Sequence, residues 1–182
     1  MGSYGGDNEL ASAQFTAGSL AYDYVTKLLA SEGFTLRVNQ SSQIPERLSE
    51  AMLSMCDLFN QRFQNRYISQ LRNAYLGVNS EHMDMRLFSS ALDSLFNGGI
   101  SWSRIVAMYA FGGFVALTYA RQGRQEMAFA VPGWIALYVC RDVTRWINDN
   151  GGWDGFVGFS QDVLNGHYEE GAEKDSAAIL CR

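Results

Sequence analysis

A chain of 182 residues is long enough to form one domain around a single hydrophobic core. Apolar residues make up 47% of it and charged residues only 18%, which excludes extensive disorder away from the ends. The net charge of −5 argues against nucleic-acid binding, which needs clustered Lys and Arg residues that this sequence does not have. The cysteines lack metal-ligand spacing, so we expect free thiols in a reducing compartment: Cys56, Cys140 and Cys181.

The first predicted element is an amphipathic helix from about residue 13 to residue 31. Leu20 and Tyr24 lie on its apolar face, and Gly33 ends the pattern. Residues 1–12 precede this pattern, and we expect them to form a flexible N-terminus.

A second helix is predicted to begin near Pro45, because proline suits the first turn of a helix. Apolar residues then recur at helical spacing on one face: Leu48, Met52, Met55, Phe59 and Phe63. By itself, such a stripe is more often part of an ordinary core than an interaction motif. Residues 65–76 predict a separate short helix, and residues 77–80 predict a turn.

A third amphipathic helix is predicted at residues 84–96, followed by a break at Gly98 and Gly99. Ser101 is well placed to cap the next helix, because its hydroxyl can accept a hydrogen bond from a free N–H group of the first turn. Arg104 lies in that first turn. It needs an anionic partner, because the rest of the helix is apolar.

Two helices at the centre of the sequence are apolar nearly all round. No charge occurs between Arg104 and Arg121, and none occurs between Glu126 and Arg141. Such a hairpin must be buried, and neither run reaches the roughly 18 to 20 apolar residues of a membrane span. We expect Pro132 to bend the second of these helices or to mark its first turns.

The end of the chain predicts one more short helix, which reaches about Leu164 after a glycine break at residues 151–152. Residues 165–182, a segment rich in acidic residues, are expected to form a mobile tail. Because sustained period-two alternation is almost absent, the predicted fold class is all-α: a helical bundle in which amphipathic helices wrap a central apolar hairpin. Residues 13–164 would form this single domain.

Catalytic and metal-binding motifs are absent from the sequence, so we predict neither an enzyme nor a cofactor. A serine or cysteine nucleophile would need a histidine base. His82 and His167 both lie in predicted turn or tail segments, where a solvated surface role is the simpler interpretation. Asp149 and Asp154 flank a glycine break, where helix capping explains them more simply than an acid–base pair.

Two blocks of this sequence resemble the first and second homology motifs of the Bcl-2 family of apoptosis regulators. The first block, residues 95–113, reads LFNGGISWSRIVAMYAFGG, and the second, residues 146–157, reads WINDNGGWDGFV. The two blocks occur in the order in which the family has them. The resemblance covers most of the chain, from about residue 13 to residue 159, and implies the Bcl-2-like helical fold.

Two further stretches resemble the family more loosely. The helix predicted at residues 13–31 is similar to the fourth homology motif, and the helix after Pro45 is similar to the third. In the third motif, Met52 stands where a leucine is usual and Cys56 stands where a glycine or alanine is usual. The match to this motif is therefore degenerate.

The resemblance implies an apolar surface groove that binds one face of a partner's amphipathic helix. Arg104 matches the family's groove arginine, whose bidentate pairing with an aspartate of that helix could contribute about 1.5–3 kcal/mol. The alternative for Arg104 is a solvated arginine near a helix start. In the same block, Ser101 stands where asparagine is usual and Ser103 where glycine is usual, which changes the contacts open to a ligand.

The predicted binding site therefore joins Arg104 and Ser101 to a set of residues with groove-lining roles. Each of these roles is implied by the resemblance, and ordinary core packing is the alternative for each. The set comprises Phe59, Phe63, Tyr67, Ala91, Leu95, Ala107, Phe111 and Phe159.

The resemblance also implies an intracellular regulator of programmed cell death, at the mitochondrial outer membrane or the endoplasmic reticulum. Residues 111–113 and 149–154 look closer to pro-survival members, which sequester the death-promoting (BH3) helix of partners such as Bax and Bak. One competing hypothesis is a membrane-permeabilising effector whose apolar hairpin leaves the core and oligomerises in lipid. A helical adaptor without a functional groove is another.

Members of this family commonly end in a hydrophobic membrane anchor. This chain stops at Arg182 without one. We therefore expect the chain as it stands to be soluble, and either an anchor would follow residues 165–182 or the protein has none.

Overall fold

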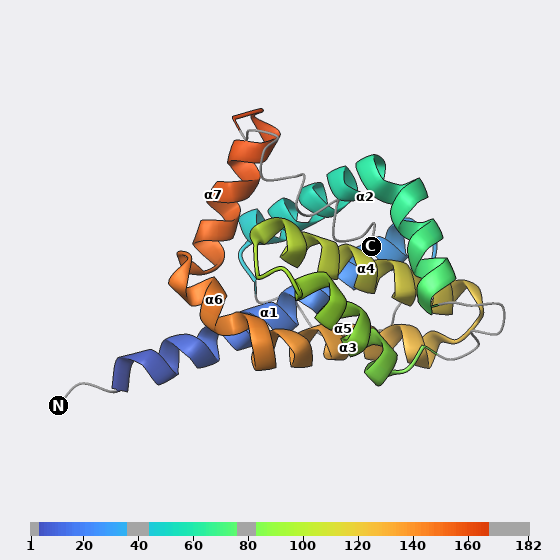
Figure 1. Cartoon of the computed structure of the whole chain (residues 1–182), viewed down its shortest axis with the longest axis horizontal. Helices are drawn as coiled ribbons and strands as arrows, with labels where there is room; N and C mark the ends of the chain where they lie inside the picture. Colours follow the sequence, from blue (N-terminus) through green and yellow to red (C-terminus); the bar gives the residue numbers. More distant parts are fainter. Residues whose placement is uncertain (1–3, 36–43, 76–82, 168–182) are drawn as a thin grey trace.

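The computed structural model describes residues 4–35, 44–75 and 83–167, and describes side chains for residues 11–35, 44–62 and 83–167. These segments form helices and contain no strand, so the predicted all-α class is confirmed (Figure 1). The elements in chain order are α1 (Tyr4–Ser31), α2 (Glu46–Tyr75), α3 (Met85–Phe96), α4 (Trp102–Arg121), α5 (Gln125–Tyr138), the π-helical segment η1 (Val139–Val143), α6 (Thr144–Asp149) and α7 (Gly152–Leu164).

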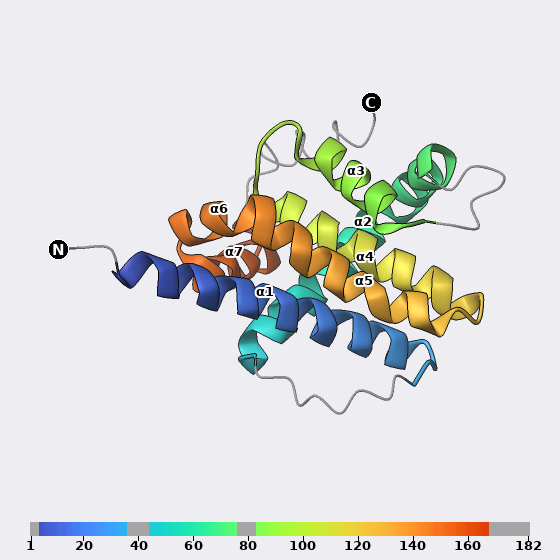
Figure 2. The same ribbon diagram turned by 90° about the horizontal axis from the view of Figure 1, so that it is seen from below.

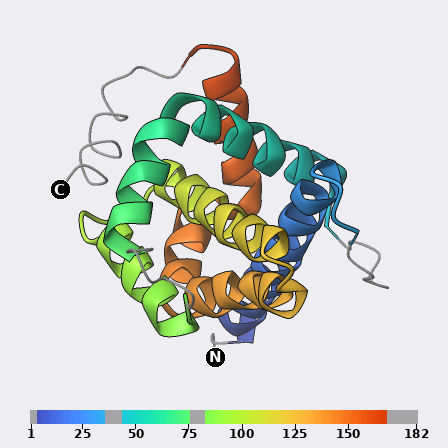
Figure 3. The ribbon, with the colours of Figure 1, turned by 90° about the vertical axis from the view of Figure 1, so that its right-hand side faces the viewer.

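Helix α4 runs through the middle of the fold, and Figure 3 shows the other helices arranged around it. Most of its residues are buried, beginning with Arg104 near its start. Among the described helices, α4 is the one that is long and apolar enough to cross a membrane, with a mean hydropathy of 1.2. In the fold, however, 78% of that stretch is buried inside the protein, which confirms the predicted central apolar helix.

Helix α5, the second helix of the predicted hairpin, is buried on one face and exposed on part of its surface. Ala128, Val131 and Ile135 form its buried face, whereas Leu137 is 57% exposed. Figure 2 shows α5 between α4 and α1, and α3 also packs against it, so only part of its surface is left uncovered. The prediction that the apolar hairpin is buried therefore holds for α4 and for one face of α5.

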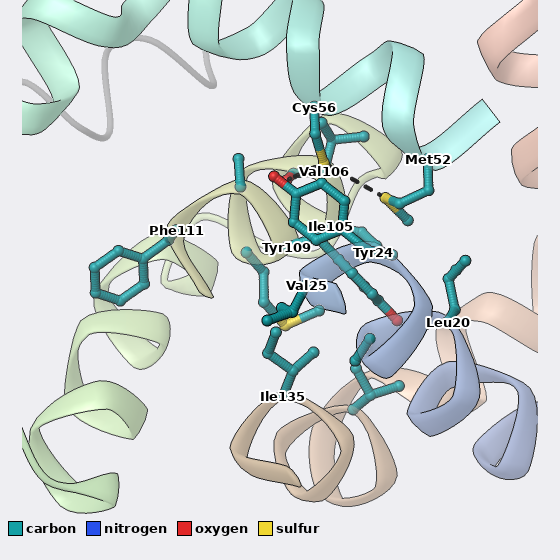
Figure 4. Packing of buried hydrophobic residues seen from close by; sticks show 14 of the residues in the cluster. Leu20, Tyr24, Val25, Met52, Cys56, Ile105, Val106, Tyr109, Phe111 and Ile135 are labelled. Carbon is teal, nitrogen blue, oxygen red and sulfur yellow. Dashed lines mark hydrogen bonds between the residues drawn. The ribbon is translucent and has the colours of Figure 1, made fainter. Parts of the chain in front are cut away.

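Close packing against α4 depends on two adjacent glycines. A Cβ atom at Gly112 would overlap the side chain of Ile135 on α5. A Cβ atom at Gly113 would lie 2.7 Å from Leu28 and 2.8 Å from the Tyr24 hydroxyl on α1. Figure 4 shows Tyr24 and Ile135 approaching α4 from the two neighbouring helices. The two glycines thus let α1 and α5 come close to the central helix.

The predicted helix starts and stops are confirmed at both glycine breaks. Ser101 caps α4, because its hydroxyl accepts a hydrogen bond from the Arg104 N–H group, with nitrogen and oxygen 3.3 Å apart. Gly99 lies just before this cap, and Gly151 and Gly152 lie at the start of α7. All three glycines have positive φ angles, which glycine adopts without the strain that a Cβ atom would cause.

Three tryptophans pack together where α4, α6 and α7 meet. The ring centroid of Trp102 lies 5.0 Å from that of Trp146 and 6.3 Å from that of Trp153. The indole N–H group of Trp153 also donates a hydrogen bond to the Ala13 carbonyl of α1, at 3.2 Å. Through this aromatic cluster, the helices on both sides of the second glycine break, α6 and α7, pack against the start of α4.

Two helices extend further than the sequence predicted. Helix α1 begins at Tyr4 rather than near residue 13, because extending a helix that the core already holds costs far less than nucleating one. Helix α2 is a single helix rather than two, because no glycine or proline interrupts it near Asn65. The predicted turn at residues 77–80 and the tail from residue 168 onward lie outside the described residues.

The end of α5 contains an irregularity that the sequence pattern did not predict. Pro132 lies inside α5 rather than in its first turns, and η1 follows the helix directly. The Val139 carbonyl accepts a hydrogen bond from the Thr144 N–H group in this wider turn and a second one from the Thr144 hydroxyl at 2.8 Å.

Candidate functional site

The start of α4 places Arg104 beside the loop that joins α3 to α4. Gly99 turns the chain with a φ angle of +102°, and Ser101 then caps the helix. Arg104 is in the first turn, and side chains of a helix lean toward its N-terminus. The local sequence therefore directs the Arg104 side chain toward the backbone of its own loop.

The guanidinium of Arg104 is held inside the protein, since only 5% of this residue is exposed. Its Nη1 group donates a hydrogen bond to the Gly99 carbonyl, whereas its buried Nε group has no hydrogen-bond partner in the described part of the chain. None of the ion pairs between described residues includes Arg104. The buried cation therefore has no anionic partner and one unsatisfied donor among the described residues, which favours an acceptor supplied by a ligand. The alternative of a solvated arginine is wrong.

The other predicted site residues divide into two groups by exposure, and for two of them no side chain is described. Four are buried, with at most 7% of each residue exposed: Ala91 and Leu95 on α3, and Ala107 and Phe111 on α4. Three are partly exposed: Phe59, Ser101 and Phe159. Phe63 and Tyr67 belong to α2, but their side chains lie outside the described residues.

Phe111 takes part in ordinary core packing. Its ring stacks on that of Phe88 in α3, with ring centroids 5.1 Å apart and an angle of 5° between the ring planes. This stack joins α3 to the central helix. Phe111 could therefore contact a ligand only if α3 moved.

The fold brings most of the predicted site to one side of α4. The C-terminal part of α2 and helix α3 lie on the same side of the central helix (Figures 2 and 3). Phe159 lies apart from α3, on α7, which packs against α2. The residues of α2, α3 and α4 thus form the coherent part of the predicted site.

The side chains that attach α3 to its neighbours were not predicted from the sequence. The Tyr138 hydroxyl donates to the Asp93 carboxylate at 3.0 Å, and the Arg141 guanidinium lies 3.5 Å from the same oxygen. Burial, and then the Asp93 carboxylate, raise the pKa of Tyr138, so its hydroxyl remains a donor. Just before α3, the Tyr119 hydroxyl donates to the Met83 carbonyl. These partners are far apart in the sequence, so no local pattern indicates them.

A bundle of amphipathic helices around one buried apolar helix defines the structural class of this protein. The family model described as "Apoptosis regulator proteins, Bcl-2 family" matches residues 52–153, which is more than half of the chain and includes Arg104. The chain therefore belongs to the Bcl-2 family, whose members are regulators rather than enzymes.

Curated relatives match this chain at moderate identity. Apoptosis regulator Bcl-2 of Gallus gallus is 29% identical over 113 residues, which are 62% of this chain and 47% of the relative. Bcl-2-like protein 1 of Sus scrofa is 37% identical over 70 residues, which are 38% of this chain and 30% of the relative. The matched region thus spans less than half of either relative.

Solved structures match a larger share of the chain. Trichuris suis BCL-2 superposes with a TM-score of 0.80 and 57% identity, over 87% of this chain and 98% of that one. Trichoplax adhaerens trBcl-2L2, bound to trBak BH3, superposes with a TM-score of 0.68 and 25% identity, over 80% of this chain and 97% of that one. The Bcl-2 fold implied by the sequence motifs is confirmed.

Proposed function

We propose that this chain is a pro-survival regulator that binds the BH3 helix of pro-apoptotic relatives such as Bax and Bak in a hydrophobic surface groove and so sequesters them. The observation that carries the proposal is the buried guanidinium of Arg104, whose Nε donor has no partner among the described residues. A carboxylate on an incoming helix would supply the missing acceptor in surroundings largely shielded from water, where a charge-assisted hydrogen bond is strong.

The groove would form along α3 and α4, with a contribution from α2. Ala91, Leu95 and Ala107 are buried, so a partner helix would reach them only after α3 moved away from α4. Helix α3 suits such a movement because it has 12 residues, its own N-cap and an outer face on which Met85 and Leu87 are exposed. Its movement would uncover apolar surface that the apolar face of the partner helix then covers.

The comparisons support the class of partner and the sign of the effect. The trBcl-2L2 structure, which shares this fold, holds a Bak BH3 segment. The relatives named Bcl-2 and Bcl-2-like protein 1 support a pro-survival function rather than an effector function. We further propose that the protein acts at the cytoplasmic side of the mitochondrial outer membrane or the endoplasmic reticulum, which fractionation of cells that express it would test.

Titration calorimetry with a Bak BH3 peptide tests the binding proposal. We expect a sub-micromolar dissociation constant that Arg104→Ala weakens roughly 10- to 100-fold, because a charge-assisted pair is lost, and that Arg104→Glu weakens further. Arg145→Ala is the matched control, because Arg145 is exposed on α6. Lack of binding by the unaltered chain, or equal losses in the Arg104 and Arg145 variants, would contradict the proposal.

A membrane-permeabilising effector is the second candidate, because α4 has the length and hydropathy of a membrane span. In that case α4 and α5 would leave the core and enter lipid. Dye release from liposomes by this chain with a Bak BH3 peptide would favour the effector, whereas inhibition of Bax-driven release would favour the pro-survival function. A chain that neither binds the peptide nor affects dye release would be a helical adaptor without a functional groove.

A further inference from the structure

Three of the six large hydrophobic residues that are exposed in the described part of the chain lie on α1 and α5: Phe15, Tyr22 and Leu137. We call these residues, together with Phe129 and Gly133 of α5, the α1–α5 face. We infer that this face binds a second copy of the chain. Figure 3 shows α1 and α3 on different sides of α4, so the contact lies apart from the proposed groove and goes beyond the proposed function.

Helices α1 and α5 run antiparallel, which places their exposed residues side by side (Figure 2). Near the end of α5, the Gln14 side chain donates a hydrogen bond to the Cys140 carbonyl at 3.4 Å. Further along, a Cβ atom at Gly133 would lie 3.7 Å from the Tyr22 hydroxyl. Higher residue numbers on α1 therefore lie beside lower ones on α5, and the exposed residues of the two helices form one continuous surface.

The exposed side of α5 is nearly symmetric about Gly133. Phe129 precedes this glycine by four residues and Leu137 follows it by four, so each points within roughly 40° of its direction, on opposite sides. A two-fold axis through Gly133 would place the second α5 antiparallel across the first, and Leu137 of each copy would meet Phe129 of the other. Gly133 at the crossing has no side chain, which lets the two backbones come close.

The charges at the two ends of α5 favour the same antiparallel arrangement. Residues 127–140 carry no charge, whereas Glu126 and Arg141 are exposed at the two ends, about equally far from the centre. The two-fold axis would bring Glu126 of each copy beside Arg141 of the other, whereas a parallel pair would bring like charges together. Because Arg141 already lies beside Asp93 and Asp142 of its own chain, these contacts fix the direction of pairing more than its strength.

A second copy fits this face in both charge and size. Its rim holds the acidic Glu126 and Asp142 beside Arg141, a mixture that suits an identical copy better than an anionic lipid surface. The 14 residues of α5 are about 21 Å long, so two adjacent helices offer roughly 400 Å². A stable interface buries about 800 Å² on each partner. We therefore expect a weak dimer, with a dissociation constant on the order of 10–100 μM.

Sedimentation equilibrium of the full chain, from about 5 to about 500 μM, tests the contact. The weight-average mass should rise from 20.3 kDa toward twice that value. Leu137→Arg should weaken association at least about tenfold, because the dimer would bury an unpaired charge. Leu164→Arg is the matched control, since Leu164 is similarly exposed but lies on α7. A chain that stays monomeric throughout, or equal weakening by both variants, overturns the inference.

A charge exchange tests the antiparallel arrangement. Glu126→Arg and Arg141→Glu each bring like charges together in the dimer, so each variant alone should associate about threefold to tenfold more weakly. An equimolar mixture should recover the association of the unaltered chain, because every Arg then meets a Glu of the other variant. This recovery would also show that both variants are folded. If each variant is weakened and the mixture does not recover, the proposed arrangement is wrong.

Two further measurements separate a second copy from other occupants. A Bak BH3 peptide should bind Leu137→Arg as tightly as it binds the unaltered chain, and a loss specific to this variant would assign the face to the peptide instead. Vesicles of phosphatidylcholine and phosphatidylserine should not bind the face. If a monomeric chain binds these vesicles and Leu137→Arg abolishes that binding, the face contacts lipid and the inference is overturned.

Discussion

Ser49 on α2 donates a hydrogen bond to the carboxylate of Asp23 on α1, and both residues are buried. The ammonium group of Lys27 lies 3.1 Å from the same carboxylate and also donates to the Ser49 hydroxyl. Asp23 and Ser49 adjoin the core residues Tyr24 and Leu48 in the sequence, whereas 48% of the Lys27 side chain is exposed. Because a buried carboxylate is stable only when its acceptor oxygens are satisfied, this contact helps to fix how α1 packs on α2.

Removing either member of this pair should destabilise the fold. We expect Asp23→Ala to lower the free energy of unfolding by about 2–3 kcal/mol, because the Ser49 hydroxyl would be left buried without its acceptor. Ser49→Ala should cost about 1–2 kcal/mol, since Lys27 can still reach the carboxylate. Urea unfolding measures both values. The double variant should cost less than the sum of the single variants, and strictly additive losses would show that the two groups do not interact.

The glycines of α4 and α7 should respond in opposite ways to alanine. Gly113→Ala should lower the free energy of unfolding by about 1–3 kcal/mol, because the added methyl group would overlap Tyr24 and Leu28. Gly158→Ala on α7 is the matched control, since no heavy atom lies within 4 Å of its added Cβ atom. That variant should gain up to about 1 kcal/mol from helix propensity. Thermal unfolding should therefore show Tm shifts of opposite sign, and a fall in both would refute this account.

Trp102 should be the most sensitive aromatic residue at the junction of α4, α6 and α7, because its ring contacts Trp146, Trp153 and Phe156. We expect Trp102→Ala to cost about 3 kcal/mol and Trp102→Phe less than half as much, since a phenyl ring keeps part of the packing. Guanidinium unfolding gives the energies, and near-UV circular dichroism should report the loss of the fixed indole environment. Equal costs for the two variants would mean that the ring contacts contribute little.

The two described cysteines should differ in reactivity, because Cys140 is exposed and Cys56 is fully buried. Burial raises the pKa of both thiols. At pH 8 the thiolate fraction of Cys140 is therefore lower than that of a free cysteine, and its reaction with Ellman's reagent should be slower and should accelerate as the pH rises. Cys56 should react only on unfolding. A Cys181→Ser background leaves only these two thiols to be counted, and rapid reaction of both in the folded protein would contradict the structure.

Local chemistry explains why the helix boundaries around the candidate site could be predicted. A serine cap and a glycine turn act on backbone groups within about four residues, so Ser101 and Gly99 mark the start of α4 in the sequence itself. The burial of α4 was predictable for a similar reason, because a helix without a polar stripe has no face suited to water.

Long-range packing explains what the sequence did not predict. Leu137 belongs to a run as apolar as α4, but the neighbours of α5, which are α1, α3 and α4, leave part of its surface uncovered, and the Leu137 side chain is exposed there. The partners Asp93 and Tyr138 are 45 residues apart, and periodicity says nothing about such a pair. Likewise, a place in the first turn of a helix does not by itself predict that Arg104 is 5% exposed. The groove-lining roles of the predicted site residues stay predictions.

The π-helical segment η1 determines which way the side chains of the following helix α6 point. A turn widened by one residue changes the phase of all later residues by roughly 100° about the helix axis. Trp146 follows this turn closely and meets the edge of Trp102 at a centroid distance of 5.0 Å. In an uninterrupted α-helix, the Trp146 indole would be rotated by roughly 100° about the helix axis, away from Trp102. The backbone irregularity therefore gives α6 the rotation at which Trp146 meets Trp102, the same ring that Trp153 and Phe156 of α7 contact.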